Sequence, residues 1–126
     1  MALILWVAAG GAIGSAARYL VNVASQRLLG PDIPWGTLAV NVSGSFIMGI
    51  LAALIAQKWL PNEHLRAFLT IGILGGFTTF SAYTLDFALL VERRDYLAAA
   101  LYGAGSVMLS LAAVFLGIWL ARAASA

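Results

Sequence analysis

Uncharged hydrogen-bonding side chains recur at helical spacing in two otherwise apolar stretches of the chain. Both stretches carry such a side chain every fourth residue: Thr37, Asn41 and Ser45 in one, and Tyr102, Ser106 and Ser110 in the other. Residues four apart share one face of a helix, and unpaired polar groups are costly in hydrocarbon. Each stripe therefore indicates the lining of a path or an interface, and the second ends where Val114 is apolar.

A run of glycine and threonine, Gly75-Gly76-Phe77-Thr78-Thr79-Phe80-Ser81, lies in the middle of a third apolar stretch. Paired glycines followed by two β-branched residues form a poor helix interior. Non-helical backbone at membrane depth is tolerated where it faces protein, water or an ion. The sequence therefore predicts a break near Gly75 to Thr79, with freed carbonyls that could coordinate a small cation. The alternative is that the glycines only allow close helix packing.

Aromatic and charged residues follow this segment or lie in the first apolar stretch. Phe80 and Tyr83 are three residues apart and share a helix face, which Asp86 continues. Aromatic ring edges are electropositive, so the pair could help to replace the water around a small anion; packing or lipid contact is the alternative. For Arg18, we expect snorkelling or pairing with a carbonyl or carboxylate.

The elements that position these residues are four membrane-spanning helices. The chain has 126 residues, is 63% hydrophobic and 10% charged, and has a mean hydropathy of +0.97, which excludes a soluble globular domain. About 20 apolar residues cross a bilayer. Uncharged or nearly uncharged stretches of that length cover residues 2–24, 34–57, 67–91 and 96–121, separated by proline-containing or charged segments. We predict one all-α transmembrane domain.

Several function classes are excluded by what the sequence lacks. It has no Cys and one His, which removes thiol chemistry and a Cys/His metal cage. There is no basic patch for nucleic acid, no phosphate-binding loop and no intramembrane carboxylate pair, so we expect neither a nucleic-acid partner nor an enzyme.

The basic residues are balanced across the predicted membrane. The side with both termini carries three and the other side also carries three: Lys58, Arg66 and Arg122, against Arg27, Arg93 and Arg94. Orientation follows the excess of basic residues in short loops. Without an excess, we hypothesise that the chain inserts both ways up and forms an antiparallel homodimer. The alternative is one orientation set by a single dominant charge.

Three motifs together resemble the Fluc/CrcB family of fluoride channels. They are Gly10-Gly11-x-x-Gly14-x-x-x-Arg18-Tyr19, Trp35-Gly36-Thr37-Leu38-x-Val40-Asn41 and the run Gly75 to Ser81, and the resemblance covers all four spans in order. It implies a dual-topology antiparallel dimer in the plasma (inner) membrane. Each of two separate pores would pass fluoride out of the cytoplasm passively, exclude chloride and so relieve fluoride toxicity.

The resemblance also implies roles for individual residues. Pore-lining and fluoride-binding roles fall to Asn41, Phe80, Tyr83, Thr37, Tyr102, Ser106 and Ser110. The carbonyls of Gly75 and Thr78 match positions that hold a structural sodium ion at the dimer centre, and Arg18 matches an arginine with a structural or vestibule role. The chain departs from the family pattern at Tyr83, usually a second phenylalanine, at Val114, often a hydroxyl, and at Asp86, commonly Glu.

Two other readings compete with the channel. A small dual-topology multidrug or guanidinium exporter exchanges cations for protons and needs a carboxylate deep in the first span, where this chain has Arg18. A scaffold subunit without transport needs only glycine packing faces, and leaves the stripes of Asn41, Ser106 and Ser110 unexplained.

Overall fold

The computed structural model describes residues 1–125 and consists of helices joined by short loops. Four helical stretches are long and apolar enough to cross a membrane, which confirms the predicted all-α membrane architecture. In chain order the helices are α1 (Ala2–Leu29), α2 (Trp35–Ala56), α3 (Glu63–Ala67), η1 (Phe68–Leu74), α4 (Gly75–Phe77), α5 (Phe80–Glu92) and α6 (Tyr96–Ser125). The elements from α3 to α5 together form the third stretch, which is broken as predicted.

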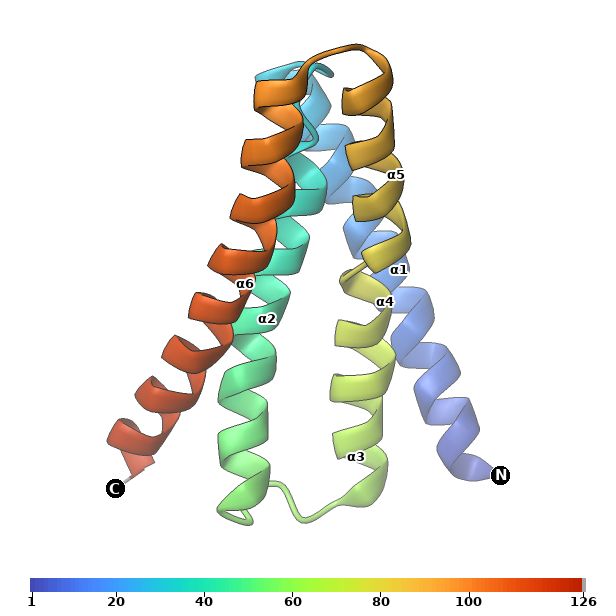
Figure 1. Cartoon of the computed structure of the whole chain (residues 1–126). Coiled ribbons are helices and arrows are strands. Elements are labelled where there is room, and N and C mark those ends of the chain that lie inside the picture. The colour runs from blue at the N-terminus through green and yellow to red at the C-terminus, as the bar shows by residue number, and fades with distance from the viewer. Residues whose placement is uncertain (126) are drawn as a thin grey trace.

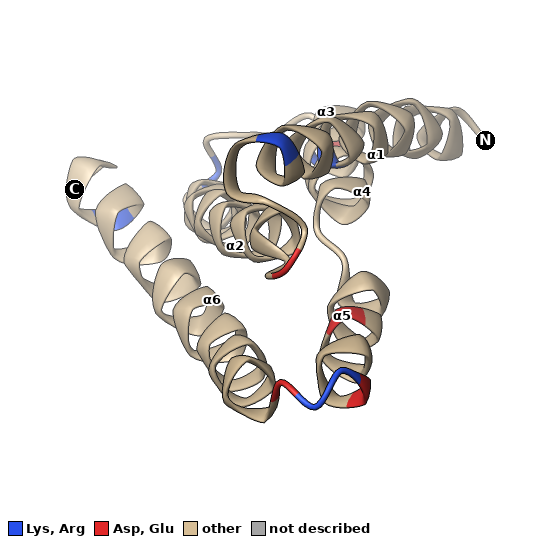
Figure 2. Cartoon of the chain, turned by 90° about the horizontal axis from the view of Figure 1, so that it is seen from above, with Lys and Arg blue, Asp and Glu red and all other residues tan. Residues whose placement is uncertain are grey.

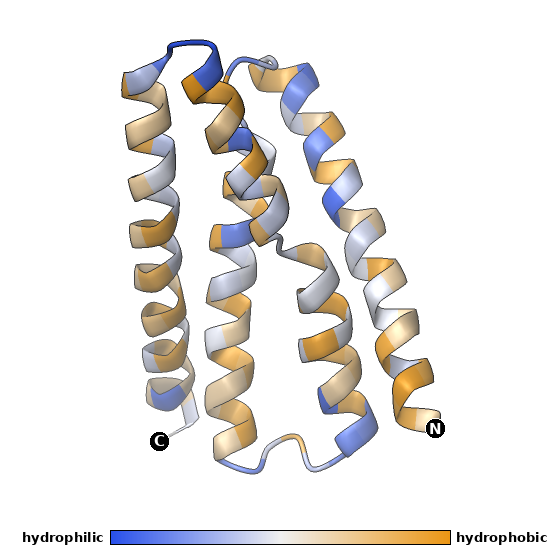
Figure 3. Ribbon diagram, turned by 45° about the vertical axis from the view of Figure 1, so that its right-hand side comes forward, coloured by the Kyte–Doolittle hydropathy of each residue, from blue (hydrophilic) through white to orange (hydrophobic). Residues whose placement is uncertain are grey.

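The two termini lie at the same end of the molecule, together with the loop between α2 and α3 (Figure 1). The loops that follow α1 and α5 lie at the other end, as four successive crossings require. Charged residues cluster in the loops and at the helix ends (Figure 2), and the middle of each long helix is mainly apolar (Figure 3). The charge balance worked out from the sequence therefore applies to the two ends of this fold.

The helix ends are set by local backbone chemistry. α1 continues to Leu29, beyond the predicted end near residue 24, and stops where Gly30 adopts a positive φ of 83°, a conformation that glycine adopts readily. Pro31 and Pro34 then prevent the helix from continuing. The third stretch begins earlier than predicted, at Glu63, because the Asn62 side chain accepts a hydrogen bond from the Leu65 N–H at 3.1 Å.

Glycines allow two pairs of helices to pack backbone against backbone. A Cβ atom added to Gly10 would lie 2.5 Å from the Phe68 carbonyl oxygen, and one added to Gly14 would overlap the Ile73 carbonyl, so α1 lies directly on η1. Gly49 and Gly117 form the equivalent contacts between α2 and α6. The spacing of Gly10 and Gly14 thus serves close packing, and these contacts position α1 against the broken helix and α2 against α6.

The segment η1 is a π-helix, which the sequence did not predict. A π-helix is wider than an α-helix because its hydrogen bonds run from residue i to i+5, and such segments are frequent near functional sites. Here the π-helix packs on α1, as α3 and α4 also do, and it ends immediately before Gly75. The single turn of α4 then leads from the π-helix into the break.

Candidate functional site: a polar cavity beside a broken helix

The helix break lies at Thr78 and Thr79, within the predicted interval. Both residues are extended, with φ and ψ of −85° and 155° for Thr78 and −152° and 123° for Thr79. The Thr78 N–H and hydroxyl both donate to the Leu74 carbonyl, at 3.0 and 2.8 Å, and so close α4. The Thr79 hydroxyl accepts from the Ala82 N–H at 3.1 Å and so caps α5. The two threonines therefore end one helix and begin the next.

The break removes the usual helical donors of the Gly75 and Thr78 carbonyls. In a continuous helix the Thr79 N–H would close on Gly75 O, but it donates instead to Asn41 Oδ1 at 2.8 Å. The Ala82 N–H would close on Thr78 O, but it donates to the Thr79 hydroxyl. Carbonyls released in this way coordinate small cations in discontinuous membrane helices. Gly75 and Thr78 are the residues predicted to hold sodium, and their carbonyls lack these helical donors.

Side chains from α1 and α2 hold the break from two sides. Arg18 on α1 donates from Nε to the Gly76 carbonyl at 3.0 Å, so it pairs with a carbonyl, as one of the expected alternatives had it. A cation suits this position because the last carbonyls of a helix carry partial negative charge. Asn41 on α2 binds both the N–H and the carbonyl of Thr79.

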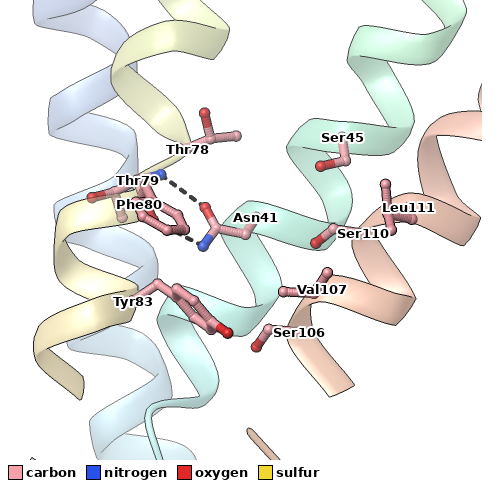
Figure 4. Close-up of a pocket in the computed structure, with 10 residues that line it drawn as sticks. All are labelled: Asn41, Ser45, Thr78, Thr79, Phe80, Tyr83, Ser106, Val107, Ser110 and Leu111. Atoms are coloured by element: carbon pink, nitrogen blue, oxygen red, sulfur yellow. Dashed lines mark hydrogen bonds between the residues drawn. The ribbon is translucent and has the colours of Figure 1, made fainter. Parts of the chain in front are cut away.

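A cavity of about 310 Å³ opens between the break, α2 and α6. It is lined by polar and apolar side chains, all of them uncharged: Asn41, Ser45, Thr78, Thr79, Phe80, Tyr83, Ser106, Val107, Ser110 and Leu111. Figure 4 shows that these residues come from three separate parts of the chain. Five of the seven residues predicted to line a pore are among them: Asn41, Phe80, Tyr83, Ser106 and Ser110.

Ser106 contributes a buried hydroxyl without a partner to the lining of this cavity. Its side chain is only 4% exposed, and among the described residues its hydroxyl has no hydrogen-bond partner. Buried polar groups are nearly always paired, and an unpaired hydroxyl costs free energy. The Ser106 hydroxyl therefore has unused hydrogen-bonding capacity at the wall of the cavity.

Aromatic rings line the side of the cavity formed by α5. The ring centroids of Phe80 and Tyr83 are 5.6 Å apart, and those of Tyr83 and Tyr102 are 5.4 Å apart. The Tyr83 hydroxyl, which a phenylalanine at this position would lack, donates to the Gly103 carbonyl at 2.6 Å. Its proton is therefore already used within the chain. Phe80 is 73% exposed and has few contacts within its own chain.

Two predicted pore residues, Thr37 and Tyr102, do not line this cavity. Thr37 is 4% exposed and Tyr102 is 5% exposed, and both lie nearer the end of the molecule at which α6 begins. The Tyr102 hydroxyl donates to Asp86 Oδ2 at 3.1 Å, which links α6 to α5. The two stripes therefore line the cavity at Asn41, Ser106 and Ser110, and their remaining predicted pore residues, Thr37 and Tyr102, lie outside it.

Ser45 and Thr79 line the cavity although the predicted pore set omits them. The signal for Ser45 was present, because it continues the stripe of Asn41 by four residues. Thr79 lay in the predicted break, but only the tertiary contact with Asn41 brings it to the cavity wall. No charged residue lines the cavity, and residues 1–125 contain no cluster of His, Cys, Asp or Glu suited to a metal ion.

The sequence profile of a known family, described as CrcB-like protein, Camphor Resistance (CrcB), matches residues 5–118. The chain belongs to the CrcB-like family. A relative from Rhodospirillum centenum, named a fluoride-specific ion channel FluC, is 55% identical over 126 residues and the full length of both chains. Relatives from Nitrobacter winogradskyi and Caulobacter sp. carry the same name. The first is 51% identical over 94% of both chains, and the second is 50% identical over 97% of this chain and 96% of the relative.

Membership of the CrcB-like family agrees with the observed fold. The match begins in α1 and ends in α6, so it includes all four stretches and the break between them. This chain is thus a multi-pass membrane protein. The names of these relatives give no support to the cation exporter considered as the alternative.

Proposed function

We propose that this chain forms a fluoride-selective ion channel, rather than an enzyme, in the plasma (inner) membrane, which lets fluoride leave the cell passively and so relieves its toxicity. The relatives named as fluoride-specific channels support the ion, since they match the chain over nearly its full length. The observation that carries the proposal is the uncharged cavity beside the helix break, whose lining includes Ser106, a buried residue whose hydroxyl has no hydrogen-bond partner among the described residues.

The donors of the cavity suit a small and strongly hydrated anion. Such an ion enters a narrow path only if protein groups replace its water. The hydroxyls of Ser45, Ser106 and Ser110 and the Asn41 amide can donate hydrogen bonds, and the Phe80 ring can present its electropositive edge. No Lys or Arg lines the cavity, so the ion meets no fixed cation that would bind it too tightly for release.

We further propose that two copies pair antiparallel and form two pores. The balance of basic residues permits both orientations. Phe80, which lines the cavity, is 73% exposed in the single chain, and Gly75, on the other side of the break, is also exposed. A partner that covers this face would complete the cavity wall at Phe80.

In such a dimer, we propose that the carbonyls of Gly75 and Thr78 hold a structural sodium ion. Both lack their usual helical donors, and backbone carbonyls are suitable ligands for a hard monovalent cation. Two carbonyls are too few for a cation site, but two copies supply four. A sodium ion bound there would supply positive charge close to the break and link the two chains.

Fluoride efflux from liposomes that contain the purified protein tests the proposed function. We expect a fluoride electrode to record efflux far above that of protein-free liposomes, and chloride efflux at the protein-free level. Phe80→Ile should abolish this efflux, whereas Phe115→Ile, on the 68% exposed side chain of a phenylalanine outside the cavity, should preserve it. Fluoride efflux at the protein-free rate in reconstituted, correctly folded protein would refute the channel.

A further inference from the structure

Helix α2 contacts the break at two points that are almost one turn apart, Asn41 and Gly44. A Cβ atom added to Gly44 would overlap the Thr78 side chain, so the backbone of α2 lies directly against that threonine. Three residues earlier, the Asn41 side chain binds Thr79. The extended segment therefore packs on one face of α2, which restricts its backbone conformation.

The Asn41 amide replaces helical hydrogen bonding at Thr79. Asn41 Oδ1 accepts from the Thr79 N–H at 2.8 Å, and Asn41 Nδ2 donates to the Thr79 carbonyl at 3.0 Å (Figure 4). These two bonds engage the peptide groups on both sides of the Thr79 Cα. Because a side-chain amide is planar, two bonds from it restrict the rotation of Thr79 as well as its position. A carboxylate at this place could accept from the N–H but could not donate to the carbonyl.

The direction of the Phe80 ring depends on this arrangement. Phe80 directly follows Thr79 and is the first residue of α5. Its side chain is 73% exposed, and its one aromatic contact within residues 1–125 is Tyr83, on the same helix. Among the described residues the ring has no aromatic partner on α2 or α6, so the backbone at the break sets the direction in which the Phe80 Cα–Cβ bond leaves the chain.

We propose that Asn41 is a positioning residue, which fixes the Thr79 backbone and through it the Phe80 ring at the cavity. One N–H of the amide binds the Thr79 carbonyl, and the second remains available to the cavity. The link to ion flux rests on the proposed channel function, whereas the structural claim about Thr79 and Phe80 does not. A residue that only lined the pore would alter flux and leave the break unchanged.

Two spectroscopic readouts on the purified full-length protein separate these roles. Selective 15N-threonine labelling reports hydrogen exchange at the Thr79 amide, and 4-fluorophenylalanine at position 80 reports the environment of the ring. Asn41→Ala should speed Thr79 exchange by about tenfold, the effect of losing one hydrogen bond. It should also shift or split the fluorine resonance. Ser106→Ala, which alters the same cavity without touching Thr79, should change neither readout.

Asn41→Asp provides a nearly isosteric second variant. Its carboxylate can still accept from the Thr79 N–H but cannot donate to the Thr79 carbonyl, so we expect the fluorine resonance to change while exchange at Thr79 stays slow. Unchanged exchange in Asn41→Ala together with an unchanged resonance in both variants would overturn the positioning role. Neither readout requires ion flux. Absence of fluoride efflux would therefore refute the channel, while the two readouts would still test the positioning role of Asn41.

Discussion

The unpaired hydroxyl of Ser106 predicts that Ser106→Ala makes the protein more stable and less active. The side chain is 4% exposed, and the structure gives its oxygen no partner. An unsatisfied buried hydroxyl costs about 1–3 kcal/mol. Alanine also exceeds serine in helix propensity by about 0.5 kcal/mol, which is offset in part by the packing lost with one oxygen atom. We therefore expect the free energy of unfolding to rise by about 1–2 kcal/mol.

Fluoride efflux should fall in the same variant. A hydrogen bond to a charged group contributes about 1.5–3 kcal/mol, which corresponds to at least about tenfold in rate if the bond forms at the barrier. Unfolding in detergent, followed by tryptophan fluorescence, gives the stability, and the liposome assay gives the flux. Ser43→Ala is the matched control, because Ser43 is exposed on α2, lies outside the cavity and donates to the Ala39 carbonyl at 2.6 Å.

The two changes in Ser106→Ala must occur together. A variant that is less stable than the parent would show that the hydroxyl is satisfied in the protein. A variant that is more stable but conducts fluoride at the parental rate would show that the hydroxyl does not serve the ion. Either result refutes the reasoning from the unpaired oxygen, and the Ser43→Ala control excludes a general effect of removing a serine.

Two further predictions concern helix packing and orientation. Gly14→Ala should destabilise the protein by about 1–3 kcal/mol, because the new methyl group overlaps the Ile73 carbonyl. Gly11→Ala is the control and should be neutral or stabilising, because no atom lies within 4 Å of its new Cβ. Denaturant titration of both variants checks this prediction. The parent chain should insert in both orientations, and one Lys added at either terminus should move the population toward termini on the cytoplasmic side; labelling of terminal tags from each side checks this, and a parent chain with one fixed orientation contradicts it.

The helix break shows how far composition can locate a structural feature. Glycine and β-branched residues predicted an interruption between Gly75 and Thr79, because a helix gains little from them. Within this interval the extended residues are Thr78 and Thr79. Arg18 on α1 binds the Gly76 carbonyl from 58 residues away, and Asn41 on α2 binds the Thr79 carbonyl from 38 residues away. Local propensity therefore predicts the interval that contains the break, whereas the long-range hydrogen bonds determine which residues in it become extended.

The polar stripes were predictable as faces of single helices. Asn41, Ser106 and Ser110 line one cavity, whereas their spacing had placed each stripe only on one face of its own helix. The period of a helix says nothing about the depth at which two helices approach or separate, so the same spacing could not show that Thr37 and Tyr102 lie outside the cavity. The pairing of Tyr102 with Asp86 likewise depends on where α5 leaves the break.

The sequence by itself determined that this protein crosses a membrane four times, that its third crossing is interrupted and that its basic residues favour neither side. These properties follow from hydropathy, backbone propensity and charge, which are sums over local residues. Only the tertiary structure decided which carbonyls are free, that Asn41 binds the Thr79 backbone and that the Ser106 hydroxyl is buried without a partner. Hydrogen bonding and burial depend on atoms brought together from distant parts of the chain, and no local pattern records them.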